Sequence, residues 1–104
     1  GGVLDKGAER VKLPGKQRQS KKPPFYNVLL HNDDVNERGY VVRVLMKVIT
    51  GMVLEDAYRI MDEAHNYNVA TVVTCAQEEA EGYCDSLRKH SLIASMEPTS
   101  SGAA

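Results

Sequence analysis

The stretch Phe25–Asp34, FYNVLLHNDD, decides the fold. Its first seven residues are mostly aromatic, β-branched or otherwise apolar, which is typical of a strand, and the Pro23-Pro24 pair before them marks a boundary. The last three residues are polar turn formers of the kind that precede helices. The stretch therefore predicts a strand that leads directly into a turn carrying two carboxylates.

Beyond this turn, apolar residues recur with the spacing of one helix face in three separate segments. The predicted helices cover approximately residues 36–49, 53–66 and 76–90. Residues 69–74 and 91–96 form two further strand-like segments. The resulting order, β-α-α-β-α-β, predicts an α+β sandwich in which a three-stranded antiparallel sheet carries three helices on one face. The order of the strands within the sheet does not follow from the sequence.

Length and charge divide the chain into a core and two tails. The 104 residues, of which 42% are hydrophobic and 26% charged, suit one small globular domain. Seven basic and two acidic residues precede Phe25, whereas six basic and twelve acidic residues follow Pro24. We therefore expect a flexible basic extension over residues 1–24, a core over 25–97 and a disordered tail over 98–104.

The sequence also argues against two classes of partner, membranes and nucleic acids. No apolar run reaches the length of a membrane span, so we expect no membrane contact. The acidic core would repel phosphate groups, and the basic extension lacks interleaved aromatic residues, so we expect no nucleic acid.

Enzymatic and metal-dependent chemistry also find little support in the sequence. Cys84 lies on an apolar helix stripe, Cys75 lies at a strand end, and nothing arranges a nucleophile with a base and oxyanion donors. We therefore expect neither an enzyme nor a cofactor. A metal site assembled in three dimensions from His31, Asp33 and His65 stays open as an alternative, although their spacing matches no zinc or calcium loop.

The polar turn offers more acceptors than one helix start requires. The simplest interpretation makes Asp33, Asp34 or Asn36 an ordinary helix cap. A single helix needs one cap, however, and His65 at the end of the second helix would lie near the same turn if the two helices pack together. Carboxylates, an amide oxygen and a neutral imidazole nitrogen together form a receptor for a small cation such as an ammonium group.

Four blocks closely resemble the ClpS family, the adaptors of the Clp AAA+ protease that recognise N-degrons, or destabilising N-terminal residues. They are Pro23–Asp34, Tyr40–Leu45, Met61–His65 and Leu92–Glu97. Details at Gly51-Met52 and Cys75-Ala76-Gln77 are most similar to the plant and algal plastid branch. This resemblance implies the plastid (chloroplast) stroma, with the bacterial cytoplasm as the alternative.

The resemblance also implies roles for particular residues. Asn32, Asp33 and His65 would hold the α-amino group of a substrate's first residue, with Asp34 and Asn36 supporting the loop. The side-chain pocket would be lined by Arg38, Val41, Met61, Ala64 and Leu92. Taken without the resemblance, Val41 and Met61 are equally what a helix-packing core would contain.

Two departures from the family pattern bear on specificity. Arg38 stands where similar bacterial members carry a Met that gates the pocket, and Ala64 stands where they carry a larger β-branched residue. A roomier pocket with a cation at its mouth predicts a preference for Phe and Trp, with Tyr as a further candidate, over Leu. The alternative for Arg38 is a solvated helix charge.

The resemblance finally implies a partner, the N-terminal domain of a Clp AAA+ chaperone. Glu78 matches an acidic contact residue of the family, whereas Tyr83 replaces a basic one. The sequence thus predicts an adaptor that binds proteins with a free, bulky hydrophobic or aromatic N-terminal residue and delivers them to a Clp unfoldase. The alternative is a structural interaction module of the ribosomal-stalk type, which shares the architecture but lacks an amine site.

Overall fold

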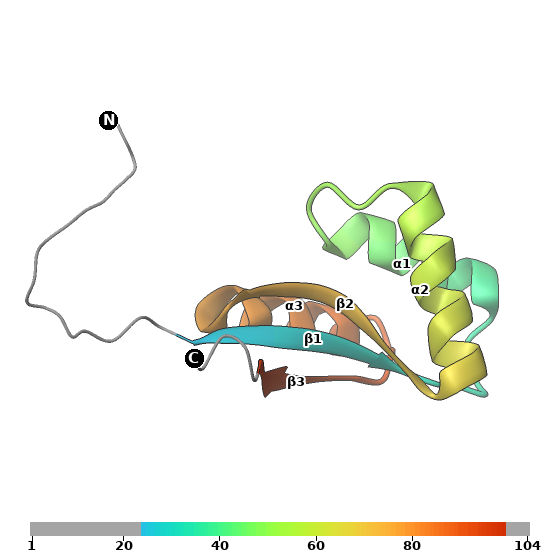
Figure 1. Cartoon of the computed structure of the whole chain (residues 1–104). Coiled ribbons are helices and arrows are strands. Elements are labelled where there is room, and N and C mark those ends of the chain that lie inside the picture. Colours follow the sequence, from blue (N-terminus) through green and yellow to red (C-terminus); the bar gives the residue numbers. More distant parts are fainter. Residues whose placement is uncertain (1–23, 100–104) are drawn as a thin grey trace, which may run out of the picture.

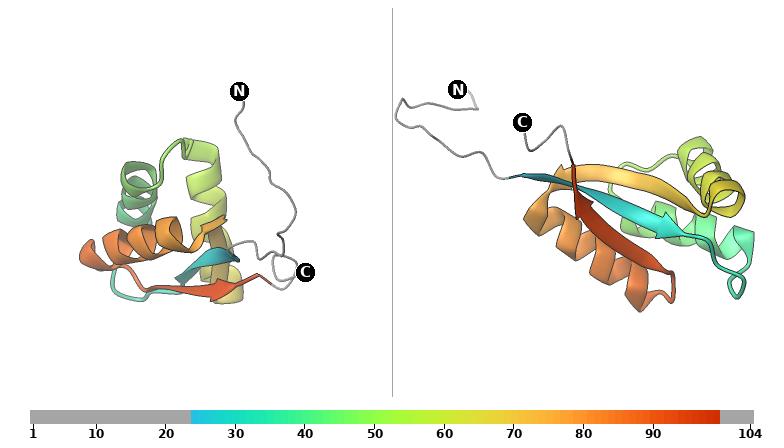
Figure 2. Two further views of the ribbon diagram at one scale, coloured as in Figure 1. Left: turned by 90° about the vertical axis from the view of Figure 1, so that its left-hand side faces the viewer. Right: turned by 60° about the horizontal axis from the view of Figure 1, so that its bottom comes forward.

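The computed structural model describes residues 24–99, and the elements within them follow the predicted order. They are β1 (Phe25–His31), α1 (Arg38–Val48), α2 (Leu54–Tyr67), β2 (Val69–Ala76), α3 (Gln77–Lys89) and β3 (Ala94–Pro98). Both strand pairs are antiparallel, and the helices gather on one side of the sheet (Figures 1 and 2). The predicted α+β sandwich is therefore confirmed. The predicted extension up to residue 23 and the tail from residue 100 lie outside the described residues.

Strand β1 lies in the centre of the sheet, whose order is β2-β1-β3. Its side chains alternate between the two faces. Val28 and Leu30 are almost fully buried beneath the helices, whereas Asn27 and His31 lie on the other face. There the Thr74 hydroxyl donates to Asn27 Oδ1 at 2.6 Å. A bulge between Val28 and Leu29 interrupts the pairing with β2, and it accompanies the curvature of the sheet in Figure 1.

The helices pack in two layers above this sheet. Helix α3 packs on all three strands, α2 packs on β1 and β2, and α1 packs on α2 and α3. The predicted apolar stripes form the core, with Leu45, Ile60 and Leu87 as its largest fully buried helix residues. The Tyr40 hydroxyl donates to the His90 carbonyl at 2.7 Å, which anchors the first turn of α1 to the end of α3.

The largest boundary difference from the prediction lies at β3, which begins at Ala94 and not at Ser91. Ser91 adopts a left-handed conformation (φ 72°), and the N–H of Leu92 donates to the Leu87 carbonyl at 3.1 Å. These residues thus close the end of α3 before the strand starts. The strand continues to Pro98, past the predicted core boundary at residue 97, and proline is tolerated there because β3 is an edge strand.

Candidate functional site

A pocket lies where β1 ends, between the first turns of α1 and the second half of α2. It encloses about 320 Å³, part of which is open to solvent. Ten residues line it: Leu30, His31, Asn32, Asp33, Asn36, Arg38, Val41, Met61, Ala64 and His65.

The loop after β1 is organised by the Asp33 carboxylate. Its Oδ1 accepts hydrogen bonds from the backbone N–H groups of Val35 (2.8 Å) and Asn36 (3.1 Å). The Asn36 side-chain amide donates to Asp33 Oδ2 at 2.6 Å and to the Ser91 carbonyl at 2.8 Å. Asn36 therefore connects the loop to the turn before β3, as a supporting residue.

The interpretation of this cluster as helix caps is wrong. The residue at the cap position of α1 is Glu37, and its side chain makes no capping hydrogen bond. The bonds of Asp33 close a turn that ends before the helix begins. The acidic cluster therefore shapes a loop at the pocket edge instead of stabilising a helix end.

The same contacts keep Asp33 charged. Burial by itself raises the pKa of its carboxyl, but the hydrogen bonds from the Asn36 side chain and from the backbone N–H groups of Val35 and Asn36 outweigh burial. They hold the pKa below the ordinary value of 3.8. The pocket rim thus carries a fixed negative charge at neutral pH.

Two backbone hydrogen bonds fix the end of β1 between its neighbours. The N–H of His31 donates to the Ile93 carbonyl, and the N–H of Asn32 donates to the Asn68 carbonyl, both at 2.9 Å. Asn68 has a left-handed conformation (φ 75°) at the C-terminal cap of α2, which turns the chain from α2 into β2. This turn places His65, in the last turn of α2, at the same pocket as Asn32.

The polar residues that the sequence singled out therefore line one pocket. Asn32 Oδ1 accepts the backbone N–H of Asp33 at 2.9 Å, and an amide oxygen has a second lone pair for another donor. The His65 side chain is exposed and makes no hydrogen bond among the described residues. Asp34 is also exposed and makes no side-chain bond within residues 24–99, so the loop is held by Asp33 and Asn36.

The apolar part of the pocket differs from expectation at one residue. Val41, Met61 and Ala64 are at least 94% buried and line the pocket. Leu92 is also buried but is absent from the lining, where Leu30 is found instead. The strand alternation places Leu30 on the helix side just before the loop, which is the signal that could have identified it.

The fold does not assemble the alternative metal site of His31, Asp33 and His65. His31 Nε2 lies 2.7 Å from the Ser95 hydroxyl, in a hydrogen bond across the face of the sheet opposite the helices. Within residues 24–99, no group of three or more His, Cys, Asp or Glu side chains is placed to hold a metal ion. Nor does any helix among those residues have the length and apolar character that crossing a membrane requires.

The two predicted docking residues lie on α3, away from the pocket lining. Glu78 is exposed in the first turn, whereas Tyr83 is half-buried against the core. Residues five apart on a helix point about 140° from each other, so the two side chains do not share one face. Glu78 is the accessible member of the pair.

Fold and pocket together define a small α+β binding domain with a polar rim above an apolar hollow. A sequence profile described as "ATP-dependent Clp protease adaptor protein ClpS" matches residues 21–95. The chain therefore belongs to the ClpS family, which is a family of adaptors and not of enzymes.

Individual relatives agree with this assignment. The chain is 49% identical to the Arabidopsis thaliana "ATP-dependent Clp protease adapter protein CLPS1, chloroplastic" over 108 residues, 98% of this chain and 68% of the relative. The protein of the same description from Chlamydomonas reinhardtii is 46% identical over 99 residues, 94% of this chain and 61% of the relative. A solved structure entitled "The structure of Agrobacterium tumefaciens ClpS2 bound to L-phenylalaninamide" matches with a TM-score of 0.68. It shares 32% identity, and the match covers 75% of this chain and 100% of that one.

Proposed function

We propose that this chain is an adaptor that captures proteins by a free, bulky hydrophobic or aromatic N-terminal residue and brings them to a Clp AAA+ unfoldase. The observation that carries the proposal is the meeting of a charged, acceptor-rich rim with an apolar pocket at the end of β1. An N-terminal residue has the complementary form, because its ammonium group lies two bonds from an apolar side chain.

The α-ammonium group would be held by Asn32, Asp33 and His65. The lowered pKa of Asp33 supports this role, since an ionised carboxylate attracts the ammonium and strengthens its hydrogen bonds. A neutral imidazole nitrogen and the amide oxygen of Asn32 supply further acceptors. An internal lysine would bring the charge without the adjacent apolar side chain, and the pocket would then stay unfilled.

The first side chain would enter the hollow lined by Leu30, Val41, Met61 and Ala64. Burying one large apolar side chain contributes about 1.5–3 kcal/mol, so the pocket distinguishes bulky residues from small ones. The bound molecule named in the Agrobacterium structure supports an aromatic preference. Phenylalaninamide combines a free α-amine with a phenyl side chain and replaces the next residue by a simple amide.

Delivery would depend on docking to the N-terminal domain of the chaperone, with exposed Glu78 as the contact residue that we propose. Tethering of this kind raises the concentration of substrate at the unfoldase and needs no chemistry by the adaptor. The chloroplastic relatives support a place in the plastid. A stalk-type interaction module is not favoured, because the relatives are ClpS adaptors and such a module would have no use for the charged rim.

The decisive experiment compares one Phe-initiated fluorescent peptide with its amine free and with its amine acetylated. Acetylation converts the ammonium into a neutral amide facing Asp33, so we expect at least a tenfold loss of affinity. A Ser-initiated peptide with a free amine serves as the control for the side-chain pocket and should also bind weakly. Equal binding of the free and acetylated peptides would overturn the proposed function.

A further inference from the structure

An ion pair joins α1 to α2 beside the pocket. Arg38 Nη1 lies 3.9 Å from Asp62 Oδ1, and each side chain is 57% exposed. Arg38 is the first residue of α1 and lines the pocket, whereas Asp62 follows the pocket residue Met61 on α2. A side chain that lines the pocket and is still half in solvent must lie at its mouth.

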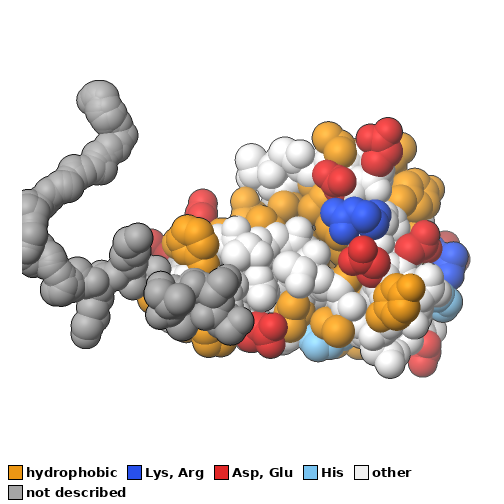
Figure 3. All heavy atoms as spheres, in the orientation of Figure 1, with side chains coloured by type: hydrophobic (Ala, Val, Ile, Leu, Met, Phe, Trp, Pro, Cys, Tyr) orange, Lys and Arg blue, Asp and Glu red, His pale blue; other side chains and the backbone are white. Residues whose placement is uncertain are grey.

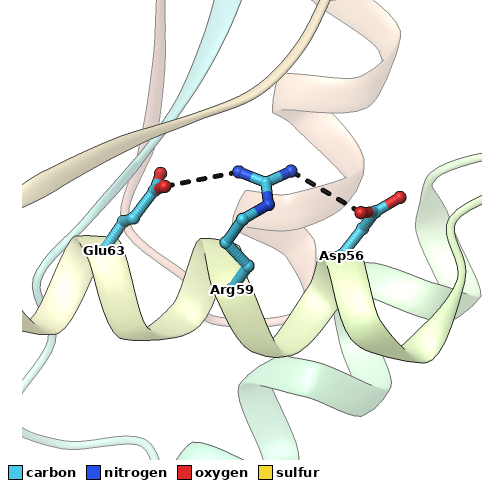
Figure 4. A network of polar contacts seen from close by, with 3 residues as sticks. All are labelled: Asp56, Arg59 and Glu63. Carbon is cyan, nitrogen blue, oxygen red and sulfur yellow. Dashed lines mark hydrogen bonds and ion pairs between the residues drawn. The ribbon is translucent and has the colours of Figure 1, made fainter.

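Asp62 is the acidic residue of α2 that is paired across the helices. Arg59 lies between Asp56 and Glu63 on the same helix, at 3.7 Å from Asp56 Oδ1 and 3.4 Å from Glu63 Oε2 (Figure 4). Asp56 and Glu63 thus both pair with Arg59 along α2. The space-filling view shows how closely acidic and basic side chains alternate at the end of the molecule formed by α1 and α2 (Figure 3).

A guanidinium at the mouth has different consequences for different substrates. Its planar cation stacks on the face of an aromatic ring, whereas a branched aliphatic side chain offers no such face. Free in solvent, however, the long arginine side chain samples many rotamers. A second charge that restrains these rotamers would therefore strengthen the contact with a bound ring.

We propose that Asp62 is a positioning residue, which holds the guanidinium of Arg38 over the pocket mouth and so favours an aromatic first residue over leucine. This inference rests on the proposed function. Exposed ion pairs shift an equilibrium by up to about fivefold, which bounds the contribution of Asp62 to selectivity. An ion pair of this strength also breaks readily, so it does not prevent a large aromatic side chain from entering the pocket.

The test measures the ratio of affinities for two peptides that differ only in a first residue of Phe or Leu. We expect Asp62→Asn to lower the Phe-to-Leu ratio about two- to fivefold, and Arg38→Met to lower it at least as much. Removing the charge of Asp62 also weakens the general attraction for the ammonium, but this affects both peptides equally and cancels in the ratio. In the Arg38→Met background, Asp62→Asn should have no further effect on the ratio.

Asp56→Asn is the matched control, because it breaks an exposed ion pair on the same helix away from the pocket lining. It should leave the ratio unchanged. High salt, which screens exposed pairs, should lower the wild-type ratio to that of the Asp62→Asn variant.

An unchanged ratio in Asp62→Asn would overturn the inference, as would an equal loss in Asp56→Asn. The acetylated Phe peptide separates this failure from failure of the proposed function. If acetylation still lowers the affinity at least tenfold in every variant, the proposed amine site stands and only the proposed role of Asp62 is refuted.

Discussion

Replacing Asn36 with alanine tests whether the shape of the loop, and not only its charge, makes the amine site. The substitution removes the amide that donates to Asp33 Oδ2 and to the Ser91 carbonyl. A hydrogen bond to a charged acceptor contributes about 1.5–3 kcal/mol and a neutral one about 0.5–1.5 kcal/mol. Because both acceptors are partly exposed and water replaces the lost donor, we take about 2 kcal/mol for the pair.

This free energy is divided between folding and binding. If half of it belongs to folding, the melting temperature falls by about 4–8 °C. The other half, about 1 kcal/mol, weakens binding of a Phe-initiated peptide about fivefold. Asn36→Asp should be worse than Asn36→Ala, since it places a second carboxylate beside Asp33 and removes the donor as well.

Fluorescence anisotropy with a free-amine Phe peptide measures the loss of binding, and thermal unfolding measures the loss of stability. Asn66→Ala is the matched control, because Asn66 is exposed on α2 and makes no side-chain hydrogen bond among the described residues. Wild-type affinity in Asn36→Ala, with Asn66→Ala equally unaffected, would refute the idea that the loop is held in a binding-competent shape by Asn36.

Three further predictions concern charge, packing and docking. The folded-state pKa of Asp33 lies below 3.8. The stability that its ionised carboxylate gives to the folded protein is therefore complete above that value and is lost as the pH falls through the lower folded-state pKa. The stability deficit of Asp33→Asn in denaturant titrations should therefore be constant from pH 7 to about pH 5 and shrink in stronger acid. Leu45 is fully buried, so Leu45→Ala should cost about 3 kcal/mol in the same titrations, and exposed Met46→Ala much less than 1 kcal/mol. Glu78→Lys should abolish chaperone-dependent degradation of a Phe-initiated substrate and leave peptide affinity unchanged, and Glu79→Lys is the control. Degradation at the wild-type rate with the Glu78→Lys adaptor would contradict the docking role.

The helices and their order follow from the sequence because their stabilisation is local and periodic. The stripe through Val41, Val44 and Leu45 needed only the helical repeat to be recognised, and these residues are buried. Strand order does not follow in this way, since the pairing of β1 with both neighbours depends on chain segments far apart in the sequence.

The candidate site was predictable in its residue types but not in its contacts. Asn32, Asp33 and His65 line one pocket, as the clustering of acceptors and the packing of the first two helices suggested. Asn36, which donates to Asp33, also reaches the Ser91 carbonyl 55 residues away, and no periodicity encodes such a contact. The absence of Leu92 from the lining has the same origin, because it depends on how the turn after α3 closes. Leu30, by contrast, follows from the alternation of β1.

The central place of β1 has a thermodynamic consequence for recognition. The site follows directly from the middle strand, and the backbone N–H groups of His31 and Asn32 donate to carbonyls on either side of it, so these two amide hydrogens should exchange with solvent more slowly than those of the exposed loop residues beyond them. Such a receptor arrives already shaped, and an incoming chain end loses little affinity to the ordering of the protein.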